Sequence, residues 1–329
     1  NFTLKVRKVF AGTFFSRDSL NFIFDSLAES SAGLVFINSN ISAIQQRNIE
    51  RYLKVKVIDR TGLILEIFSE RAKSFEGRLQ VDLARLSYQK SRLVKSWTHL
   101  ERQRGGKGFL GGPGETQIES DRRQLDSQIK NIKVKLRIVE KTRKLHRESR
   151  KSLQFPFVTL VGYTNVGKSS LFNRLANSSN LEKDMLFATL DASARRVSLP
   201  SSKDIIISDT VGFISNLPTQ LIKSFKSSLE EVISSDLIIH VIDLSSPFAS
   251  DERQEVKKIL DELNIDWHKT KIIEIGNKQD LLNSDNDALK NSEISLTISA
   301  KNDVHFEELL RLIDLNLVEE LQKESLILK

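Results

Sequence analysis

The sequence predicts an α/β protein of three segments, and three observations lead to this fold class. Short runs rich in β-branched residues alternate with helical patterns near both ends of the chain, which is typical of parallel sheets covered by helices. Two stretches with heptad-like apolar spacing lie between them. The 329 residues suffice for about two domains with separate cores. We expect the segments to be 1–75, 76–152 and 153–329.

Composition excludes several classes of protein. The chain has no cysteine, so disulfides, thiolate metal sites and cysteine nucleophiles are excluded. No apolar run approaches the ~18 residues that a membrane-spanning helix needs, and the five histidines show no metal-ligand spacing. Because the start of the chain lacks the pattern of a signal peptide, we expect a cytoplasmic protein of bacterial type without a membrane span, with peripheral membrane association or an organellar origin as open alternatives. We also expect a monomer.

The first segment is predicted to form a small α/β unit. The runs Leu34–Asn38 and Val55–Asp59 are typical of buried strands. The order strand, helix, strand, helix favours a parallel sheet. Between the two strands, apolar residues recur at spacings compatible with one helical face: Ile41, Ile44, Ile49 and Leu53.

The second segment predicts an antiparallel helical hairpin. Residues 105–114 hold six of the chain's 14 glycines together with Pro113, so we expect a loop there rather than a helix. A heptad-like apolar seam lies on either side of this loop. The first seam is Leu79, Leu83, Leu86, Leu93, Trp97 and Leu100, and the second is Ile118, Leu125, Ile129, Ile132, Leu136 and Val139.

Positive charge is concentrated in the same hairpin. From Lys90 to Lys151 there are 18 Lys and Arg against 7 Asp and Glu, a net charge of +11, whereas the whole chain carries only +7. A solvated helical face is one interpretation, but a basic hairpin with a glycine tip favours an arm that binds a polyanion. Only two aromatic residues, Trp97 and Phe109, lie in this stretch. We therefore expect contact with phosphates and recognition of shape rather than base stacking.

The third segment again alternates strands and helices, as nucleotide-binding α/β domains do. A helical pattern over Phe306–Leu321 follows its last strand. The strand candidates are Val158–Val161, Asp204–Ser208, Leu237–Ile242, Lys271–Ile275 and Ile294–Ile298.

A phosphate-binding motif follows the first of these strands. Gly162–Ser169 matches G-x-x-x-x-G-K-[ST] in full, between an apolar strand and a helical pattern. In such a loop the backbone N–H groups point at phosphate oxygens. Lys168 would neutralise the β- and γ-phosphates, and the Ser169 hydroxyl would ligate Mg²⁺. The residues expected to bind nucleotide here are Gly162, Tyr163, Thr164, Asn165, Val166, Gly167, Lys168, Ser169 and Ser170.

Two further motifs are expected to sense the γ-phosphate. Asp209 ends a strand and can hold Mg²⁺ through water, while the Gly212 N–H can contact the γ-phosphate. Thr189 is the candidate switch threonine, which would also ligate Mg²⁺. We expect Lys168, Thr189 and Gly212 to act in catalysis. The residues expected to contact the nucleotide are Phe187, Ala188, Thr189, Leu190, Asp209, Thr210, Val211 and Gly212.

A third motif predicts guanine specificity. Asp280 in Asn277-Lys278-Gln279-Asp280 can accept the N1–H and N2–H donors of guanine, whereas adenine offers no matching donors. Buried hydrogen bonds of this kind can discriminate by ~10⁴. We therefore expect GTP and GDP as ligands. The candidate contacts are Asn277, Lys278 and Asp280, with backbone N–H groups of Ser299, Ala300 and Lys301 directed at guanine O6.

Phe213 follows Gly212, at the position where Ras-like enzymes commonly have a glutamine that orients the attacking water. A phenyl ring can neither orient water by hydrogen bonding nor accept a proton. We therefore expect slow intrinsic hydrolysis that rises when a partner supplies the positioning.

With these motifs in place, the chain resembles the HflX-type ribosome-associated GTPases over essentially its whole length. The signature Gly111–Gln117 at the glycine loop is specific to that family, whereas the phosphate and guanine motifs are shared by many GTPases. The resemblance rests on Ile58–Leu65, His99–Gln103, Gly111–Gln117, Asp121–Arg123, Leu186–Asp191 and Asp209–Phe213.

The resemblance implies an N-terminal α/β subdomain, a long antiparallel helical hairpin and a Ras-like P-loop GTPase domain. It implies binding to the large (50S) ribosomal subunit, with hairpin residues 90–151 on rRNA and the glycine loop in the peptidyl-transferase region. Related proteins split or rescue stalled ribosomes and hydrolyse GTP faster when bound to them. Asn165 matches the phosphate-loop asparagine of several potassium-stimulated GTPases, which implies K⁺ dependence.

Two hypotheses of function follow from these features. In the first, the nucleotide state sets the affinity of the protein for rRNA. In the second, the protein is a nucleotide-regulated scaffold whose hairpin pairs with a helix of another protein or of a second copy, because heptad seams permit such pairing. Binding of a polyanion should fall steeply with ionic strength, whereas apolar helix pairing should barely respond.

Overall fold

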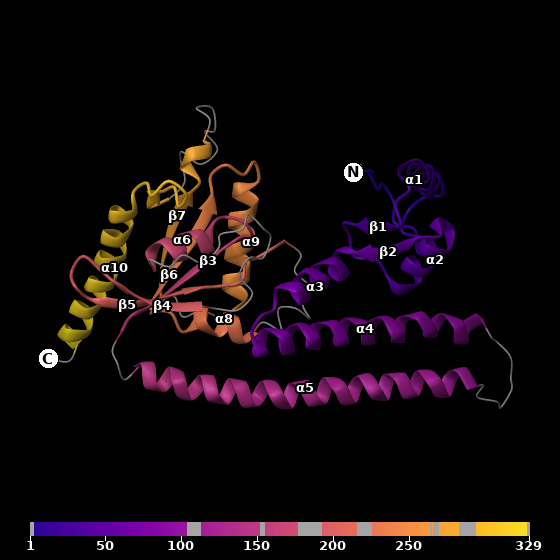
Figure 1. The fold of residues 1–329 in the computed structure, drawn as a ribbon, viewed down its shortest axis with the longest axis horizontal. Coiled ribbons are helices and arrows are strands. Elements are labelled where there is room, and N and C mark those ends of the chain that lie inside the picture. The colour runs from indigo at the N-terminus through magenta and orange to yellow at the C-terminus, as the bar shows by residue number, and fades with distance from the viewer. Residues whose placement is uncertain are drawn as a thin grey trace. The chain divides into compact units, whose positions relative to one another are not determined.

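The computed structural model confirms the predicted α/β class (Figure 1). It describes residues 3–103, 113–151, 155–176, 193–215, 226–263, 265, 270–282 and 294–327. The chain divides into two compact units, of which unit 1 comprises Asn1–Glu70 with Leu79–Leu136 and unit 2 comprises Arg71–Arg78 with Arg137–Lys329. In the described part of the chain, every helix is too short or too polar to cross a membrane.

The N-terminal part of unit 1 is a small α/β arrangement around a two-stranded parallel sheet. Strand β1 (Leu34–Ile37) pairs with β2 (Lys56–Asp59), and α2 (Ala43–Leu53) connects them, as predicted. Helix α2 begins where Ser42 and Gln45 cap each other's backbone N–H groups. The remaining helices are α1 (Arg17–Ser30) and α3 (Arg60–Arg71), and the buried core is Phe15, Leu20, Ile23, Ile37, Ile41, Ile49, Leu53 and Val57.

The predicted hairpin is formed by α4 (Phe75–Gln103) and α5 (Pro113–Lys151). The two helices run antiparallel (Figure 1). Lys90 of α4 pairs with Asp126 of α5. The glycine loop lies mostly outside the described residues. Pro113 and Gly114, which we expected in that loop, are instead the first residues of α5. The first position of a helix tolerates proline because its backbone N–H has no helical partner there.

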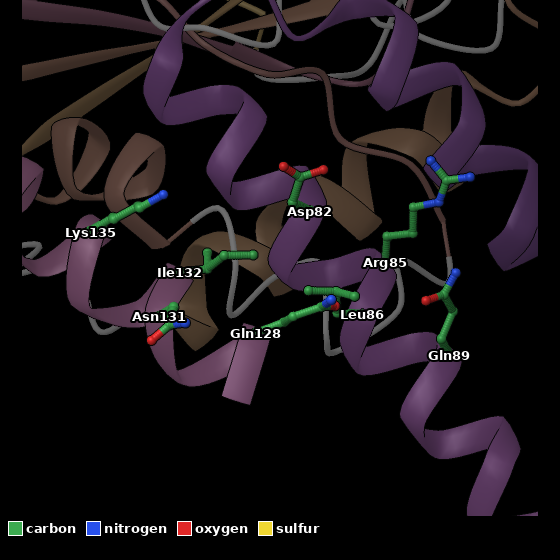
Figure 2. A pocket seen from close by; sticks show the side chains of 8 residues that line it. All are labelled: Asp82, Arg85, Leu86, Gln89, Gln128, Asn131, Ile132 and Lys135. Carbon is green, nitrogen blue, oxygen red and sulfur yellow. The ribbon is translucent and has the colours of Figure 1, made fainter. Parts of the chain in front are cut away.

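The two apolar seams pack along the hairpin, where Leu79 and Leu136 are buried. An open groove of about 450 Å³ remains between the helices. Figure 2 shows Gln128 and Ile132 of α5 extending toward Leu86 of α4. The groove is lined by Asp82, Arg85, Leu86 and Gln89 of α4 and by Gln128, Asn131, Ile132 and Lys135 of α5.

A buried polar cluster attaches α4 to the sheet of unit 1. Asp59, at the end of β2, is 3% exposed. Its carboxylate accepts hydrogen bonds from the Tyr88 hydroxyl (2.5 Å), Arg92 Nη2 (2.5 Å) and the Gly62 backbone N–H (2.8 Å). Burial, reinforced by Asp59, raises the pKa of Tyr88. The charge of Asp59 is thus compensated inside the fold, as a buried carboxylate requires.

Unit 2 contains a six-stranded sheet in the order β4-β5-β3-β6-β7-β8. All five predicted strands are present, although β8 is shorter than expected. The structure adds β4, which the sequence analysis missed and which pairs antiparallel with β5 at the edge of the sheet. The strands are β3 (Phe157–Gly162), β4 (Ser193–Ser198), β5 (Asp204–Asp209), β6 (Leu237–Asp243), β7 (Lys271–Asn277) and β8 (Leu296–Thr297).

Helices cover both faces of this sheet. Leu160 of β3 packs in one apolar cluster with residues of α6 and α10, whereas the next residue, Val161, packs in a second cluster with residues of α8 and α9. This alternation follows from the two-residue period of a strand. The helices are α6 (Lys168–Leu175), α8 (Lys226–Ile233), α9 (Ala249–Glu262), the short 3₁₀ helix η1 (Gln279–Leu281) and α10 (Phe306–Ile327).

Candidate functional site

The predicted phosphate loop connects β3 to α6 at the carboxyl end of a central strand. Asn165 (φ +63°) and Gly167 (φ +92°) adopt the left-handed conformation. Turns of this kind direct successive backbone N–H groups to one side of the loop, and the N-terminus of α6 adds partial positive charge there. The loop therefore has the shape and polarity of an anion-binding site.

The Lys168 side chain lies folded within this loop and is only 5% exposed. Its ammonium group donates hydrogen bonds to the carbonyl oxygens of Gly162 (3.0 Å) and Tyr163 (2.7 Å). Burial lowers the pKa of Lys168 to about 8, and the charge of Asp209 opposes this effect. The cation is thus held where a phosphate bound by the loop would meet it.

Asp209 and Ser169 come together beside the loop. Asp209 ends β5, opposite Leu160 of β3, and is 1% exposed. The Ser169 hydroxyl donates a hydrogen bond of 2.8 Å to Asp209 Oδ2. A hydroxyl and a carboxylate are the hard oxygen donors that Mg²⁺ prefers, so the residues present fit this ion. Thr189, the other predicted ligand, lies outside the described residues.

The segment after Asp209 is hydrogen-bonded to the phosphate loop. The Phe213 N–H donates to the Gly162 carbonyl (3.1 Å), and the Thr164 N–H donates to the Phe213 carbonyl (2.7 Å). A Cβ on Gly212 would lie 3.0 Å from Thr164 Cα and 3.2 Å from the Lys168 ammonium nitrogen. Glycine at position 212 therefore lets this backbone approach the lysine and the phosphate position closely.

Phe213 is a core residue. Its side chain is 3% exposed and packs with Val161, Leu229 and Ile238 beneath helices α8 and α9. The ring points into the apolar cluster, where it can neither bind nor orient water. This placement agrees with the expectation that the position supplies no catalytic side chain.

Asn277 bridges the phosphate loop and the guanine motif. The residue ends β7 and is 2% exposed. Its amide nitrogen donates to the Val166 carbonyl (2.8 Å), and its amide oxygen accepts from the Ala300 N–H (2.9 Å). We expected both Asn277 and the Ala300 N–H to contact the base, but in the structure they bond to each other and join two loops.

Asp280 is held at the rim of the same edge. Its Oδ1 atom accepts a hydrogen bond of 2.6 Å from the Ser299 hydroxyl, while the residue as a whole is exposed. Lys278 adopts φ +64° and its ammonium group pairs with Asp243 at 2.7 Å. The serine orients the carboxylate, and the lysine fixes the loop that carries it.

One residue of the site escaped the sequence analysis. Arg174, at the end of α6, pairs with Asp303 at 3.0 Å and donates to the Lys301 carbonyl at 3.4 Å. It attaches the loop Ser299–Lys301 to the helix that follows the phosphate loop. An arginine in the last turn of a helix is unremarkable in sequence, so no local pattern signals this role.

The structure gathers most of the predicted site residues along the carboxyl edge of the sheet, which is where open α/β sheets bind ligands. The predicted residues Phe187, Ala188, Thr189 and Leu190 lie outside the described part of the chain. Those gathered along this edge are Gly162 to Ser170, Asp209 to Gly212, Asn277, Lys278, Asp280 and Ser299 to Lys301.

Gly167→Ala is expected to damage both loops together. A Cβ at this position would lie 2.3 Å from the Asn277 amide nitrogen, on a backbone with φ +92°. We predict a loss of GDP affinity of at least about tenfold, or ~1.4 kcal/mol, measured by equilibrium titration with a fluorescent GDP. Gly33→Ala is the control because a Cβ there meets nothing within 4 Å. Equal affinities for the two variants would contradict the bridging role of Asn277.

Three protein-family models match successive parts of the chain. Residues 1–69 match the N-terminal region of GTP-binding GTPases, residues 71–150 match their middle region, and residues 157–278 match the 50S ribosome-binding GTPase family. The third match agrees with a Ras-like P-loop GTPase domain preceded by a helical region.

Solved structures show the same fold. A GTP-binding protein from the archaeon Sulfolobus solfataricus in complex with GDP is 25% identical, with a TM-score of 0.50. The alignment covers 95% of this chain and 88% of that one. A second GDP complex, described as SsGBP, gives a TM-score of 0.51 at the same identity.

Several curated relatives share the name GTPase HflX and match most of the chain. GTPase HflX of Magnetococcus marinus is 48% identical over 85% of this chain and 65% of its own length. The HflX of Escherichia coli is 45% identical over 79% of this chain and 60% of its own length. The chain thus spans less than two thirds of the length of these two relatives. The HflX of Caldanaerobacter subterraneus is 45% identical over 90% of this chain and 68% of its own length. The chain therefore belongs to the HflX family of GTPases.

Proposed function

We propose that this protein binds GTP, hydrolyses it to GDP and phosphate, and uses the cycle to control binding to the large ribosomal subunit, in splitting or rescue of ribosomes under stress. The observation that carries the proposal is the meeting of the phosphate loop, the Asp209–Gly212 segment and the guanine motif at one sheet edge. We further propose that it acts as a monomer in the bacterial cytoplasm.

In this proposal the nucleotide lies along the carboxyl edge of the sheet. The backbone N–H groups of Gly162–Ser169 and the Lys168 ammonium bind the β- and γ-phosphates. The Gly212 N–H lies beside Lys168 and contacts the γ-phosphate. The Asp280 carboxylate, oriented by Ser299, accepts the two donors of the guanine edge, which adenine lacks.

Ser169 would hold Mg²⁺ directly and Asp209 through water, with Thr189 as a further ligand. When bound, the ion neutralises charge on the phosphates. The chain itself supplies the charge of Lys168 and the hydrogen bonds of the loop. Because Phe213 is buried in the core, no side chain at that position holds the attacking water. Hydrolysis by the isolated chain is therefore slow, and a bound partner completes the positioning.

The hairpin supports the ribosomal part of the proposal. Residues 90–151 carry a net charge of +11, and the basic side chains Arg122, Arg123, Lys130 and Lys133 of α5 are exposed. Clustered cations on an exposed helix suit phosphate contacts with rRNA. The match of residues 157–278 to 50S ribosome-binding GTPases points to the same partner.

The scaffold hypothesis has one observation in its favour, since three apolar residues of α5 are exposed: Val134 (49%), Ile138 (64%) and Leu145 (60%). The seam residues whose side chains the structure describes, however, are buried or half-buried. The net charge of +11 over residues 90–151 and the match to 50S ribosome-binding GTPases nevertheless favour the ribosomal function.

Co-sedimentation with purified large subunits tests the proposal. We expect stronger pelleting with a non-hydrolysable GTP analogue than with GDP, and a steep loss of pelleting as salt rises. The pair of changes Lys130→Gln and Lys133→Gln should lower the salt slope by about 1 for each phosphate contact removed. Lys258→Gln with Arg311→Gln removes two exposed cations elsewhere and is the control. Weak pelleting that is equal in both nucleotide states and insensitive to salt would contradict the proposal.

Asp280→Asn tests base recognition. The amide oxygen can still accept the Ser299 hydrogen bond, but the amide cannot accept both donors of guanine. We expect GTP affinity to fall by about 10²-fold or more, while xanthosine triphosphate, which has an acceptor at C2, binds better than to the natural protein. Asp251→Asn, an exposed carboxylate in the first turn of α9, is the control. Unchanged GTP affinity in titrations of Asp280→Asn would rule out this contact.

Potassium dependence is a separate prediction. Asn165 is exposed at the phosphate loop with φ +63°, so its side chain can reach an ion beside the phosphates. We expect the hydrolysis rate to fall severalfold when Na⁺ replaces K⁺ at constant ionic strength, with GDP affinity measured in both salts as the control. Identical rates in the two salts would contradict K⁺ dependence, but they would not contradict the proposal that the protein hydrolyses GTP.

A further inference from the structure

A buried polar contact lies directly behind the Asp209–Gly212 segment. The Ser208 hydroxyl donates a hydrogen bond of 2.7 Å to Glu231 Oε2, and the two residues are 0% and 8% exposed. Ser208 precedes Asp209 on β5, and Glu231 lies on α8. Helix α8 therefore contacts the strand end that carries Asp209.

The same helix also contacts the residue after Gly212. Leu229 and Val232 of α8 pack in one cluster with Phe213. At the end of α8, the Ser235 hydroxyl donates to the Glu231 carbonyl at 2.8 Å. A shift of α8 would thus move both ends of the segment that is proposed to contact Mg²⁺ and the γ-phosphate.

The other oxygen of the Glu231 carboxylate faces the root of the hairpin. Arg143 of α5 lies 3.8 Å from Glu231 Oε1 and 3.1 Å from Glu76 Oε2 of α4, measured from guanidinium nitrogens. The side chains of Arg143, Glu231 and Glu76 are 24%, 10% and 14% exposed. One guanidinium therefore joins both helices of the hairpin to α8.

Burial makes this contact energetically consequential. Arg143 pairs with two carboxylates that have little access to water, so removal of its guanidinium takes a positive charge away from both of them. The pair gives a direct electrostatic contact between α5 and Glu231. Residues 71–78 and 137–151, which form the root of the hairpin, belong to the same compact unit as α8 and β5.

We propose that Arg143 and Glu231 are positioning residues that couple the hairpin to the nucleotide site. In this account, rRNA bound along α5 changes the Arg143–Glu231 contact, and α8 passes the change to Asp209 and Gly212. The inference rests on the proposed function, because it assumes that large subunits bind the hairpin. Neither residue touches the nucleotide, so their effect is on coupling and not on basal binding.

The test measures the coupling free energy. The affinity of the full chain for a fluorescent, non-hydrolysable GTP analogue is titrated with and without purified large ribosomal subunits, and the ratio of the two dissociation constants is the coupling factor. For the natural protein we expect a ratio of at least about tenfold, within the usual range for linked sites.

Glu231→Gln keeps the side-chain volume and an acceptor for Ser208 but removes the charge that pairs with Arg143. We expect the coupling factor of Glu231→Gln, and that of Arg143→Gln, to fall to within about twofold of 1. Because the two residues act as a pair, the double variant should have the same coupling factor as either single variant. Affinity for the analogue alone should stay near that of the natural protein. Arg143→Lys, which retains the charge, should recover part of the coupling.

The matched control is the exposed pair Glu307 and Arg311 on α10, separated by 3.6 Å. Glu307→Gln and Arg311→Gln should keep the full ratio. The inference would be overturned if variants of Arg143 and Glu231 kept the full coupling factor as well. It would also be overturned if these variants lost the same amount of analogue affinity with and without subunits. If thermal unfolding shows that Glu231→Gln is not folded, the test rests on Arg143→Gln, because Arg143 is the more exposed of the two residues.

A natural protein whose ratio is 1 would overturn the proposed function itself, and with it the coupling. A natural protein with a large ratio whose variants also keep that ratio would overturn the inference alone. The two failures are therefore distinguishable in the same titration.

Discussion

The candidate nucleotide site depends on one contact, the hydrogen bond from the Asn277 side chain to the backbone of the phosphate loop. The amide of Asn277 joins Val166 on one side and Ala300 on the other. Gly167 has no side chain, and only for that reason can the amide approach so closely. Two loops that are far apart in sequence are thereby held in one arrangement, and the positions of Lys168 and Asp280 follow from it.

The second constraint is the placement of charge and of apolar side chains around this edge. Phe213 is buried in the core, and the proposed slow intrinsic hydrolysis rests on this placement. Positive charge is concentrated between residues 90 and 151, outside the residues that surround the nucleotide edge. The proposed function thus assigns recognition of the nucleotide and attraction of a polyanion to different parts of the chain. A contact such as that between Arg143 and Glu231 is the kind of link that lets one part influence the other.

Local patterns were sufficient to predict most of the fold and the phosphate loop. Most strands of the larger sheet are predicted by continuous apolar runs, and the phosphate loop is predicted by a motif of eight residues that includes Lys168. Both patterns lie within a few consecutive residues. Strand β4 was missed because only Val197 among its side chains is buried, which leaves no period to detect. The bridging role of Asn277 and the pairing of Arg143 with Glu231 could not be predicted either. These contacts join residues between 88 and 111 positions apart, and single-sequence patterns carry no information at that range.

The central claim is that a slow guanine-nucleotide site becomes active when the ribosome supplies what Phe213 cannot. The most direct measurement is the rate of phosphate release from saturating GTP by the purified chain, with and without purified large ribosomal subunits. The account predicts a low rate for the chain alone and a rise of at least about tenfold with subunits, equivalent to ~1.4 kcal/mol of barrier. A high rate for the chain alone that subunits leave unchanged would contradict it.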